Sequence, residues 1–378
     1  MLHTIPMVDL QAQYRRFKGE IDLAILNVLD EGIFIQGNIV REFENQLAAT
    51  LNVKHVITCA NGTDALQIAF MALDLPKGSE VIIPTYTYAA LAEILHLLGL
   101  IPVFVDVMKD GFLMDVSQIA SKITSKTKAI APVHLFGECA DLFEIIKIAK
   151  QHSLFVIEDT AQAIGSVFCA EGLSGFGGTL GDIGTTSFFP SKNLGCYGDG
   201  GAIFTNNDHL ANKMRMIANH GQSQKYIHEI IGINSRLDTI QAAILRIKLP
   251  RLDAYIDARR KVADHYDAFF EAYPQIKTPV RGKESRHVFH QYTMQLFGID
   301  RDALVSFLAT KEVPSMIYYP VPAHRQKMFS AFGSAATVLP VTDALTSCVM
   351  SLPIHTEMEQ EQLDFICASV AEFIIAHS

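Results

Sequence analysis

One lysine, Lys192, has an unusual setting within the stretch SFFPSKNLGCYGDGGA, residues 187–202. A surface lysine usually keeps its ammonium group in water among polar neighbours, whereas aromatic, small and glycine residues surround this one. A lysine acts as a nucleophile when burial or a nearby cation makes its free amine accessible near neutral pH. The setting therefore predicts a reactive amine, and the alternative is a lysine on an ordinary glycine-rich surface loop.

A second segment, CANGTDAL at residues 59–66, offers groups that could hold a phosphate. A strand is expected to end here, with Gly62 turning the chain and Thr63 opening a helix whose backbone N–H groups form a cradle. Ser187, five residues before Lys192, could bind the same phosphate. An ordinary helix cap is the alternative, because Thr and Asp are favoured at helix starts with or without a ligand.

A third segment, FVIEDTAQAIGS at residues 155–166, ends an apolar strand on Glu158 and Asp159. A carboxylate at the edge of an apolar site needs a cationic or hydrogen-bonded partner, and a protonated pyridine nitrogen is such a partner. The alternative is that Asp159 only caps the following turn. A phosphate cradle, a pyridinium partner and a reactive lysine together are what pyridoxal 5'-phosphate (PLP) requires.

The elements that must position these groups belong to an α/β pattern. From about residue 54 to 205, short β-branched runs alternate with helix-period segments, which predicts a mostly parallel sheet flanked by helices. Sites in such sheets lie beyond the carboxyl ends of the strands. The expected strands are 54–59, 80–84, 101–106, 128–133, 154–159 and 201–205, and the expected helices include 63–73, 89–98 and 141–152. The glycine-rich stretch 171–184 is expected to be a loop.

The length of 378 residues predicts a large domain with a smaller one after it. Residues 237–272 have a helical pattern and form the expected connection. A strand is expected at 287–297, a helix at 300–312 and an amphipathic closing helix at 359–376. We therefore predict a PLP-binding domain over 1–250, including an N-terminal helical segment, and a C-terminal α/β domain over 251–378.

Composition excludes several classes of protein. The net charge is -9 and the basic residues are scattered, which argues against a nucleic-acid or membrane partner. The N-terminus lacks the apolar segment of a secretory signal. The six cysteines are widely spread without a C-x-x-C pair, so neither a metal site nor a disulfide framework is indicated, and reduced thiols in a cytoplasm are expected.

Six motifs together resemble one family over nearly the whole chain: NGTDAL, PTYTYAA, EDTAQAIGS, SFFPSKNLGCYGDGGA, GINSRLDTIQAA and YYPVPAH. They are similar to those of the DegT-type nucleotide-sugar aminotransferases, which have PLP-dependent transferase fold type I. The resemblance implies that Lys192 carries PLP covalently and that Asp159 pairs with the pyridine nitrogen. It further implies that Gln162 lies against one face of the ring and that Tyr88 stacks on the other.

The same resemblance implies how the phosphate is held and how the subunits assemble. Gly62, Thr63 and Ser187 would bind the phosphate of PLP. Asn234 would join them from the second subunit of a homodimer, so that the active sites lie at the dimer interface.

The activity implied is transfer of an amino group from L-glutamate to the keto carbon of a nucleotide-linked ketosugar, with Lys192 moving the proton. Arg236 is the candidate for an anionic group of either substrate. Tyr319 and His324 are expected to line the sugar pocket, and packing or solvation is the alternative for all three. Many members have His-Tyr-Pro where this chain has Tyr318-Tyr319-Pro320, so the chain departs from the family at that histidine's sugar contact.

The lysine motif is most similar to the branch that aminates C3 of UDP-linked 3-ketosugars, such as UDP-2-acetamido-2-deoxy-3-oxo-glucuronate, for surface glycans such as lipopolysaccharide O-antigen. A dTDP-3-keto-6-deoxyhexose is the alternative substrate. A PLP-dependent sugar dehydratase has a histidine in place of the lysine, so Lys192 argues against that activity. A non-catalytic regulator on the same fold would be expected to have lost part of the cofactor-binding set.

Overall fold

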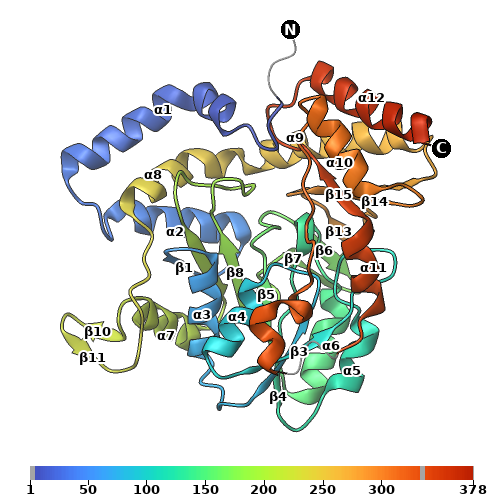
Figure 1. The fold of residues 1–378 in the computed structure, drawn as a ribbon. Helices are drawn as coiled ribbons and strands as arrows, with labels where there is room; N and C mark the ends of the chain where they lie inside the picture. Colours follow the sequence, from blue (N-terminus) through green and yellow to red (C-terminus); the bar gives the residue numbers. More distant parts are fainter. Residues whose placement is uncertain (1–4, 333–336, 378) are drawn as a thin grey trace.

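A seven-stranded sheet forms the centre of the fold (Figure 1). The computed structural model of the chain describes residues 5–332 and 337–377. The strand order is β1-β9-β8-β5-β4-β2-β3, and β9 is antiparallel to both neighbours whereas the other adjacent pairs are parallel. The bounds are β1 His55–Cys59, β2 Glu80–Pro84, β3 Ile101–Val105, β4 Thr127–Ile130, β5 Phe155–Asp159, β8 Ile183–Ser187 and β9 Gly201–Thr205. The mostly parallel α/β sheet predicted from the sequence is confirmed.

One sequence-based expectation within this region needs correction. Residues 171–184 are not only a loop, because β7 (Leu173–Phe176) pairs with β6 (Val167–Ala170) as a hairpin and β8 begins at Ile183. β8 has the sequence IGTTS, and its two threonines are buried with their hydroxyl groups bonded to carbonyl groups of residues 158 and 160. A strand stabilised in this way lacks the apolar pattern on which the prediction depended.

Helices cover both faces of the sheet. Strand β2 illustrates why, since Val81 and Ile83 face one apolar cluster and Ile82 faces another. The first face packs against α3 (Gly62–Ala72), α4 (Ala90–Leu97) and α7 (Asp208–Ala218). The opposite face packs against α6 (Leu142–His152) near β3 and β4, and against α2 (Asn38–Leu51) and α8 (Thr239–Lys248) near β1 and β9. Burial on both faces suits the parallel strands.

The expected helical connection at 237–272 consists of α8, a short 3-10 turn at Leu249–Arg251 and α9 (Leu252–Phe270). The turn contains Pro250, which lacks the N–H group that an uninterrupted helix needs. Helix α1 (Leu10–Glu31) packs along α8, as Figure 1 shows. This arrangement places α8 between the N-terminal helix and the body of the sheet.

A second apolar core lies beside the sheet domain. It joins α9, α10 (Arg301–Thr310) and α12 (Gln360–His377) to an antiparallel sheet of β12 (Ile276–Lys277), β14 (Tyr292–Leu296) and β15 (Val349–Leu352). Helix α9 contributes to both cores: Ile256 packs in the core of the sheet domain, and Tyr266 packs in the second core. Ala323 and Leu345 pack against the first core although they follow residue 251. The boundary near residue 250 therefore stays a prediction.

The remaining elements are short. They are η1 Val116–Gln118, α5 Ile119–Lys122, η2 Leu135–Gly137, β10 Gln222–Gln224, β11 Ile227–His228, β13 Ser285–Arg286, η4 Ala323–Arg325, η5 Lys327–Phe332 and α11 Pro340–Cys348. Within the described ranges, no helix combines the length and the apolar character needed to cross a membrane.

Candidate active site

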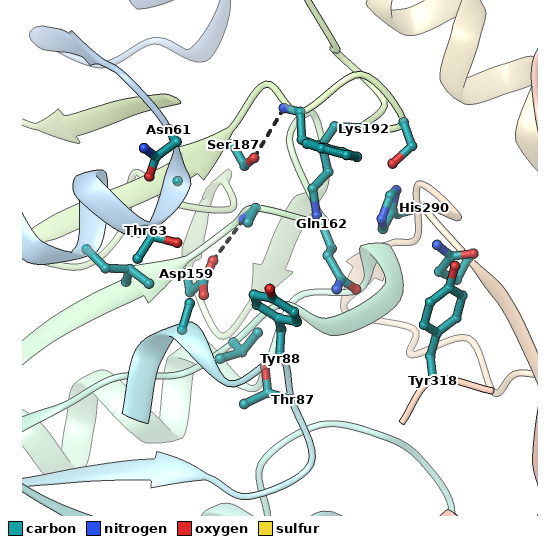
Figure 2. A pocket seen from close by; sticks show the side chains of 18 of the residues that line it. Asn61, Thr63, Thr87, Tyr88, Asp159, Gln162, Ser187, Lys192, His290 and Tyr318 are labelled. Atoms are coloured by element: carbon teal, nitrogen blue, oxygen red, sulfur yellow. Dashed lines mark hydrogen bonds between the residues drawn. The ribbon is translucent and has the colours of Figure 1, made fainter. Parts of the chain in front are cut away.

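A cavity of about 730 Å³ lies beyond the carboxyl ends of the parallel strands. Figure 2 shows its side chains converging from the segments after β1 and β2, from the ends of β5 and β8, and from the segments that contain Lys192, His290 and Tyr318. Of the residues predicted from the sequence, the cavity is lined by Gly62, Thr63, Tyr88, Asp159, Gln162, Ser187, Lys192 and Tyr319. Segments that lie far apart in the chain, from Asn61 to Tyr319, therefore meet here, as expected for an open α/β sheet.

The N-terminus of α3 forms one end of the cavity. The helix begins at Gly62, one residue earlier than predicted, because Asn61 is the N-cap and its Oδ1 accepts from the Asp64 N–H at 2.8 Å. The N–H groups of Gly62 and Thr63 have no partner within the helix, as in any first helical turn. A Cβ placed on Gly62 would lie 2.8 Å from the Ser187 Cβ, so only glycine allows this approach. Backbone donors and two hydroxyl groups thus face one small space.

Asp159 ends β5 within the cavity. Its Oδ1 accepts from the Ala161 N–H at 2.9 Å, which is the turn-capping bond considered as an alternative role (Figure 2). Its main-chain groups bond to Pro132 and His134, so the position of the carboxylate is fixed. Burial raises the pKa of Asp159, and the Lys192 charge opposes this rise. A carboxylate in this setting gains stability from a cation placed next to it.

The adjacent carboxylate, Glu158, is fully buried on the other face of β5 and has a structural role. Its oxygens accept from the N–H groups of Gly178, Leu180 and Gly181 and from the His134 Nε2 at 2.8 Å. The His134 Nδ1 accepts from the Ala140 N–H, so the ring proton lies on Nε2 and is donated to Glu158. Glu158 therefore has its partners within the chain, whereas Asp159 faces the cavity.

Gln162 is held at both ends of its amide group. Its Oε1 accepts from the Phe136 N–H and its Nε2 donates to the Tyr319 hydroxyl, both at 2.9 Å. Tyr88 also lines the cavity, with its ring centre 6.3 Å from that of Tyr319 and 63% of its surface exposed. An exposed tyrosine at a cavity wall can provide an aromatic face for a ring-shaped ligand.

Lys192 projects into the same space (Figure 2). Burial lowers the pKa of Lys192 to about 8, and the Asp159 charge limits the decrease. The lysine N–H of the main chain bonds to Phe189 O at 2.8 Å, which fixes the loop at the point where the side chain leaves it. About a tenth of the amine is therefore unprotonated at pH 7, far more than for an ordinary lysine, and a nucleophilic lysine requires this form.

These residues fit PLP by the chemistry of their donor groups. The α3 N-terminus with Thr63 and Ser187 offers donors for a phosphate, Asp159 forms no ion pair with any described residue, and Lys192 offers an amine. The cofactor-binding roles of Gly62, Thr63, Tyr88, Gln162 and Ser187 are consistent with these positions.

Three predicted site residues do not line this cavity. Asn234 is exposed and pairs by a bridge with Asn219. Arg236 lines a separate cavity of about 680 Å³, which also contains Glu44 and Arg215. His324 is fully buried, and its Nδ1 lies 2.6 Å from the Thr85 Oγ1. The imidazole of His324 is buried against Thr85, so it holds η4 against the end of β2 and does not line the cavity.

Sequence reasoning missed several cavity residues, and three of them, Asn61, His290 and Gln291, have polar side chains that could contact a ligand. Asn61 has a detectable signal, since asparagine before a helix is a favoured N-cap. His290 and Gln291 carry no motif of their own, and they reach the cavity because β14 begins immediately after them. His290 is 4% exposed and its Nδ1 has no hydrogen-bond partner among the described residues. Burial, with Lys192 nearby, holds the pKa of His290 well below its usual value, so the ring is neutral.

Residues 16–371 match the family model described as the DegT/DnrJ/EryC1/StrS aminotransferase family. A protein of Acidithiobacillus ferrooxidans named UDP-N-acetyl-3-dehydro-alpha-D-glucosamine 3-aminotransferase is 45% identical, over 95% of each chain. The UDP-2-acetamido-2-deoxy-3-oxo-D-glucuronate aminotransferase of Pseudomonas aeruginosa is 43% identical, over 97% of this chain and 99% of its own length.

Two further similarities bear on the cofactor and on the alternatives. A pleiotropic regulatory protein of Geobacillus stearothermophilus is 43% identical over 98% of each chain. The crystal structure of NtdA from Bacillus subtilis with bound cofactor PMP has a TM-score of 0.91 and 31% identity, covering 99% of this chain and 86% of that one. PMP is the amine form of PLP, so a protein with this fold binds the predicted cofactor.

Proposed function

This chain belongs to the DegT/DnrJ/EryC1/StrS aminotransferase family, and on that premise we propose that it moves an amino group from L-glutamate to C3 of a UDP-linked 3-ketosugar. It is a PLP-dependent sugar aminotransferase. The observation that carries the assignment of residues is the convergence of Lys192, Asp159 and the α3 N-terminus on one cavity. Two relatives named for UDP-3-ketosugars support the substrate class.

PLP, when bound, withdraws electrons from the carbon that gains or loses the amino group. The phosphate would be held by the N–H groups that open α3 and by the hydroxyls of Thr63 and Ser187. Asp159 would keep a proton on the ring nitrogen, because its buried carboxylate is stabilised by that positive charge. Gln162 and Tyr88 would restrict the ring between them.

Lys192 has two tasks in this proposal. Its amine would hold the cofactor before substrate arrives, and once free it would take a proton from the Cα of the amino donor and return it to the cofactor carbon. The pKa of about 8 suits both tasks, because the group can accept and release a proton near neutral pH. His290 stays neutral beside it, so this ring adds no competing positive charge.

The charge of the cavity supports a contribution from a second subunit. Among the described residues that line it, Lys192 is the one lysine or arginine, while Asp64, Asp159 and Asp199 are acidic. Glutamate and a nucleotide sugar are anions, so they need further cations. Asn234 and Arg236 lie together outside the cavity, and we propose that they complete the partner's site in a homodimer.

The surface near this segment supports the homodimer. Large apolar side chains are exposed on and after α1 and around the β10–β11 hairpin, and exposed apolar side chains in such number are typical of an interface. They are Leu23, Leu26, Leu29, Ile33, Phe34, Ile35, Tyr226, Ile227 and Ile231.

Mixing two inactive variants tests the contribution from the partner. Lys192→Ala protein and Asn234→Ala/Arg236→Ala protein should each be inactive as homodimers. Random reassociation should restore about a quarter of wild-type activity, because each hybrid dimer regains one intact site. No restored activity, with hybrid formation shown by differently tagged subunits, would place Asn234 and Arg236 in their own chain's site and contradict the proposal.

The substrate assignment is tested with ketosugars made in situ. Purified protein with PLP and L-glutamate should aminate a UDP-linked 3-ketosugar, measured by mass spectrometry of the sugar product. A faster reaction with dTDP-3-keto-6-deoxyhexoses would overturn the UDP assignment. A regulator without catalysis would convert neither substrate, and its visible absorption band would not change when glutamate is added.

The cellular setting follows from the same proposal. All six cysteines are free, which supports a reducing compartment, and we place the enzyme in the cytoplasm. The aminated sugar would enter a surface glycan such as lipopolysaccharide O-antigen.

A further inference from the structure

The loop that carries Lys192 is held tightly from within. It runs from Phe188 to Gly198, and the Cys196 N–H bonds to Phe188 O at 2.8 Å. A Cβ on Gly195 would lie 2.3 Å from Pro190 O, so the two sides of the loop touch at their backbones. Such a loop has little freedom of its own, and its position depends on the element packed against its outer side.

That element is α8. The Gln241 amide binds both main-chain polar groups of Tyr197. Its Oε1 accepts from the Tyr197 N–H at 2.9 Å, and its Nε2 donates to Tyr197 O at 3.5 Å. Two turns further on, Lys248 donates from Nζ to Gly195 O at 2.8 Å. Residues seven apart lie on the same face of a helix, so one face of α8 holds consecutive peptide groups of the loop.

Lys248 is unusual because its side chain is charged and 1% exposed. A buried ammonium group is costly unless other groups replace water. Its Nζ lies 4.2 Å from the centre of the Tyr197 ring, so a carbonyl and an aromatic face provide that replacement. Burial still lowers the pKa of Lys248 to about 8. Lys248 does not line the cavity, so its contacts serve the loop and not a ligand.

We propose that Lys248 is a positioning residue for Lys192: by binding Gly195 O and the Tyr197 ring, it fixes the loop so that the Lys192 amine is aimed into the cavity. Gly195 lies three residues after Lys192, so displacement of this carbonyl moves the attachment point of the reactive side chain. This inference rests on the proposed role of Lys192 as the residue that holds PLP.

Attachment of PLP to the apo-protein provides a measurement independent of turnover. PLP is added in excess, the visible band is followed in time, and the product is reduced with borohydride and mapped by peptide mass spectrometry. Lys248→Met should slow attachment at Lys192 about tenfold or more, since small misplacements of reacting groups have large kinetic effects. The kcat should fall in parallel, while the KM for the sugar stays within about twofold.

Two further variants separate positioning from general stability. Ile145→Ala in α6 creates a cavity at the other end of the sheet from α8, near β3 and β4, so it should lower the melting temperature but attach PLP at the wild-type rate. Lys248→Gln retains an N–H donor of shorter reach and should attach PLP faster than Lys248→Met. If Lys248→Met does not fold, Lys248→Gln against wild type still decides the question.

Attachment at the wild-type rate in Lys248→Met, or in Lys248→Gln where it alone is soluble, would overturn the positioning role. Failure of the wild-type protein itself to form an adduct at Lys192 would instead contradict the proposed role of Lys192. The two failures are therefore distinguishable.

Discussion

Lys192 and Lys248 lie on opposite sides of one loop and differ in what their ammonium groups face. Burial lowers the pKa of each to about 8. Lys192 opens onto a cavity that contains Asp159, whereas Lys248 faces a carbonyl oxygen and an aromatic ring. A lowered pKa therefore does not distinguish a reactive lysine from a structural one. The distinction comes from access to a ligand and from the charge placed beside the amine.

The largest expected difference between the two lysines is in turnover. Lys192→Ala should lower kcat by about 10⁴-fold or more, because no other amine lines the described cavity to hold PLP and move the proton. PLP should remain bound without a covalent bond, which dialysis and borohydride treatment can measure. A reduced adduct on Lys248 in this variant would contradict the comparison, because it would show that the amine of the buried lysine can reach the cofactor.

The next difference concerns pH. Attachment of PLP to wild-type apo-protein should accelerate as pH rises, with a midpoint near the pKa of about 8 for Lys192 and about tenfold slower attachment for each pH unit below it. Asp159→Asn should move this midpoint to lower pH, because the Asp159 charge raises the pKa of Lys192.

Lys248→Met should leave that midpoint unchanged while slowing attachment, since Lys248 acts on geometry. The rates are measured by stopped-flow absorbance at saturating PLP. A midpoint that shifts in Lys248→Met and not in Asp159→Asn would reverse the roles given to the two sites.

The smallest effect is on stability, and here the two lysines should behave alike. Between about pH 8 and the usual lysine value of 10.5, the unfolded chain binds more protons at these positions than the folded chain. Each lysine therefore makes the free energy of unfolding rise with pH in that range. The buried cysteines act in the opposite direction, because burial raises the pKa of their thiols.

Comparison with variants isolates the contribution of the lysines. Urea unfolding of apo-protein at about pH 8 and 9 should give a less positive pH slope in Lys192→Met and in Lys248→Met than in wild type. An unchanged slope in either variant would mean that the lysine concerned is not held with a lowered pKa.

The sequence alone predicts those site residues that lie where a regular strand or helix pattern ends. Asp159 and Gly62 follow β-branched strands, and Lys192 lies in a run of aromatic and glycine residues, so each has a local signal. β8 has no such signal, because Thr185 and Thr186 are stabilised by hydrogen bonds formed only in the folded sheet. Tertiary contacts of this kind cannot be read from local residue types.

The same limit applies to residues that reach the site from distant segments. His290 enters the cavity because Arg259 binds its carbonyl oxygen and that of Phe289, both at 3.2 Å, in a junction between the two cores. His324 carries a motif that suggests a pocket residue, yet its imidazole is buried against Thr85. Lys248 reads as an ordinary helical lysine in the sequence, since nothing local indicates that it faces inward.

Helix α8 starts directly after the segment that contains Asn234 and Arg236. Its final residue, Lys248, binds the loop that carries Lys192. Ten residues of helix separate these ends by about 15 Å. In the proposed homodimer, each α8 helix would connect the active site of its own subunit to the two side chains that complete the active site of the other subunit. Crosstalk between the two centres would then have a short, stiff route through a single element of secondary structure.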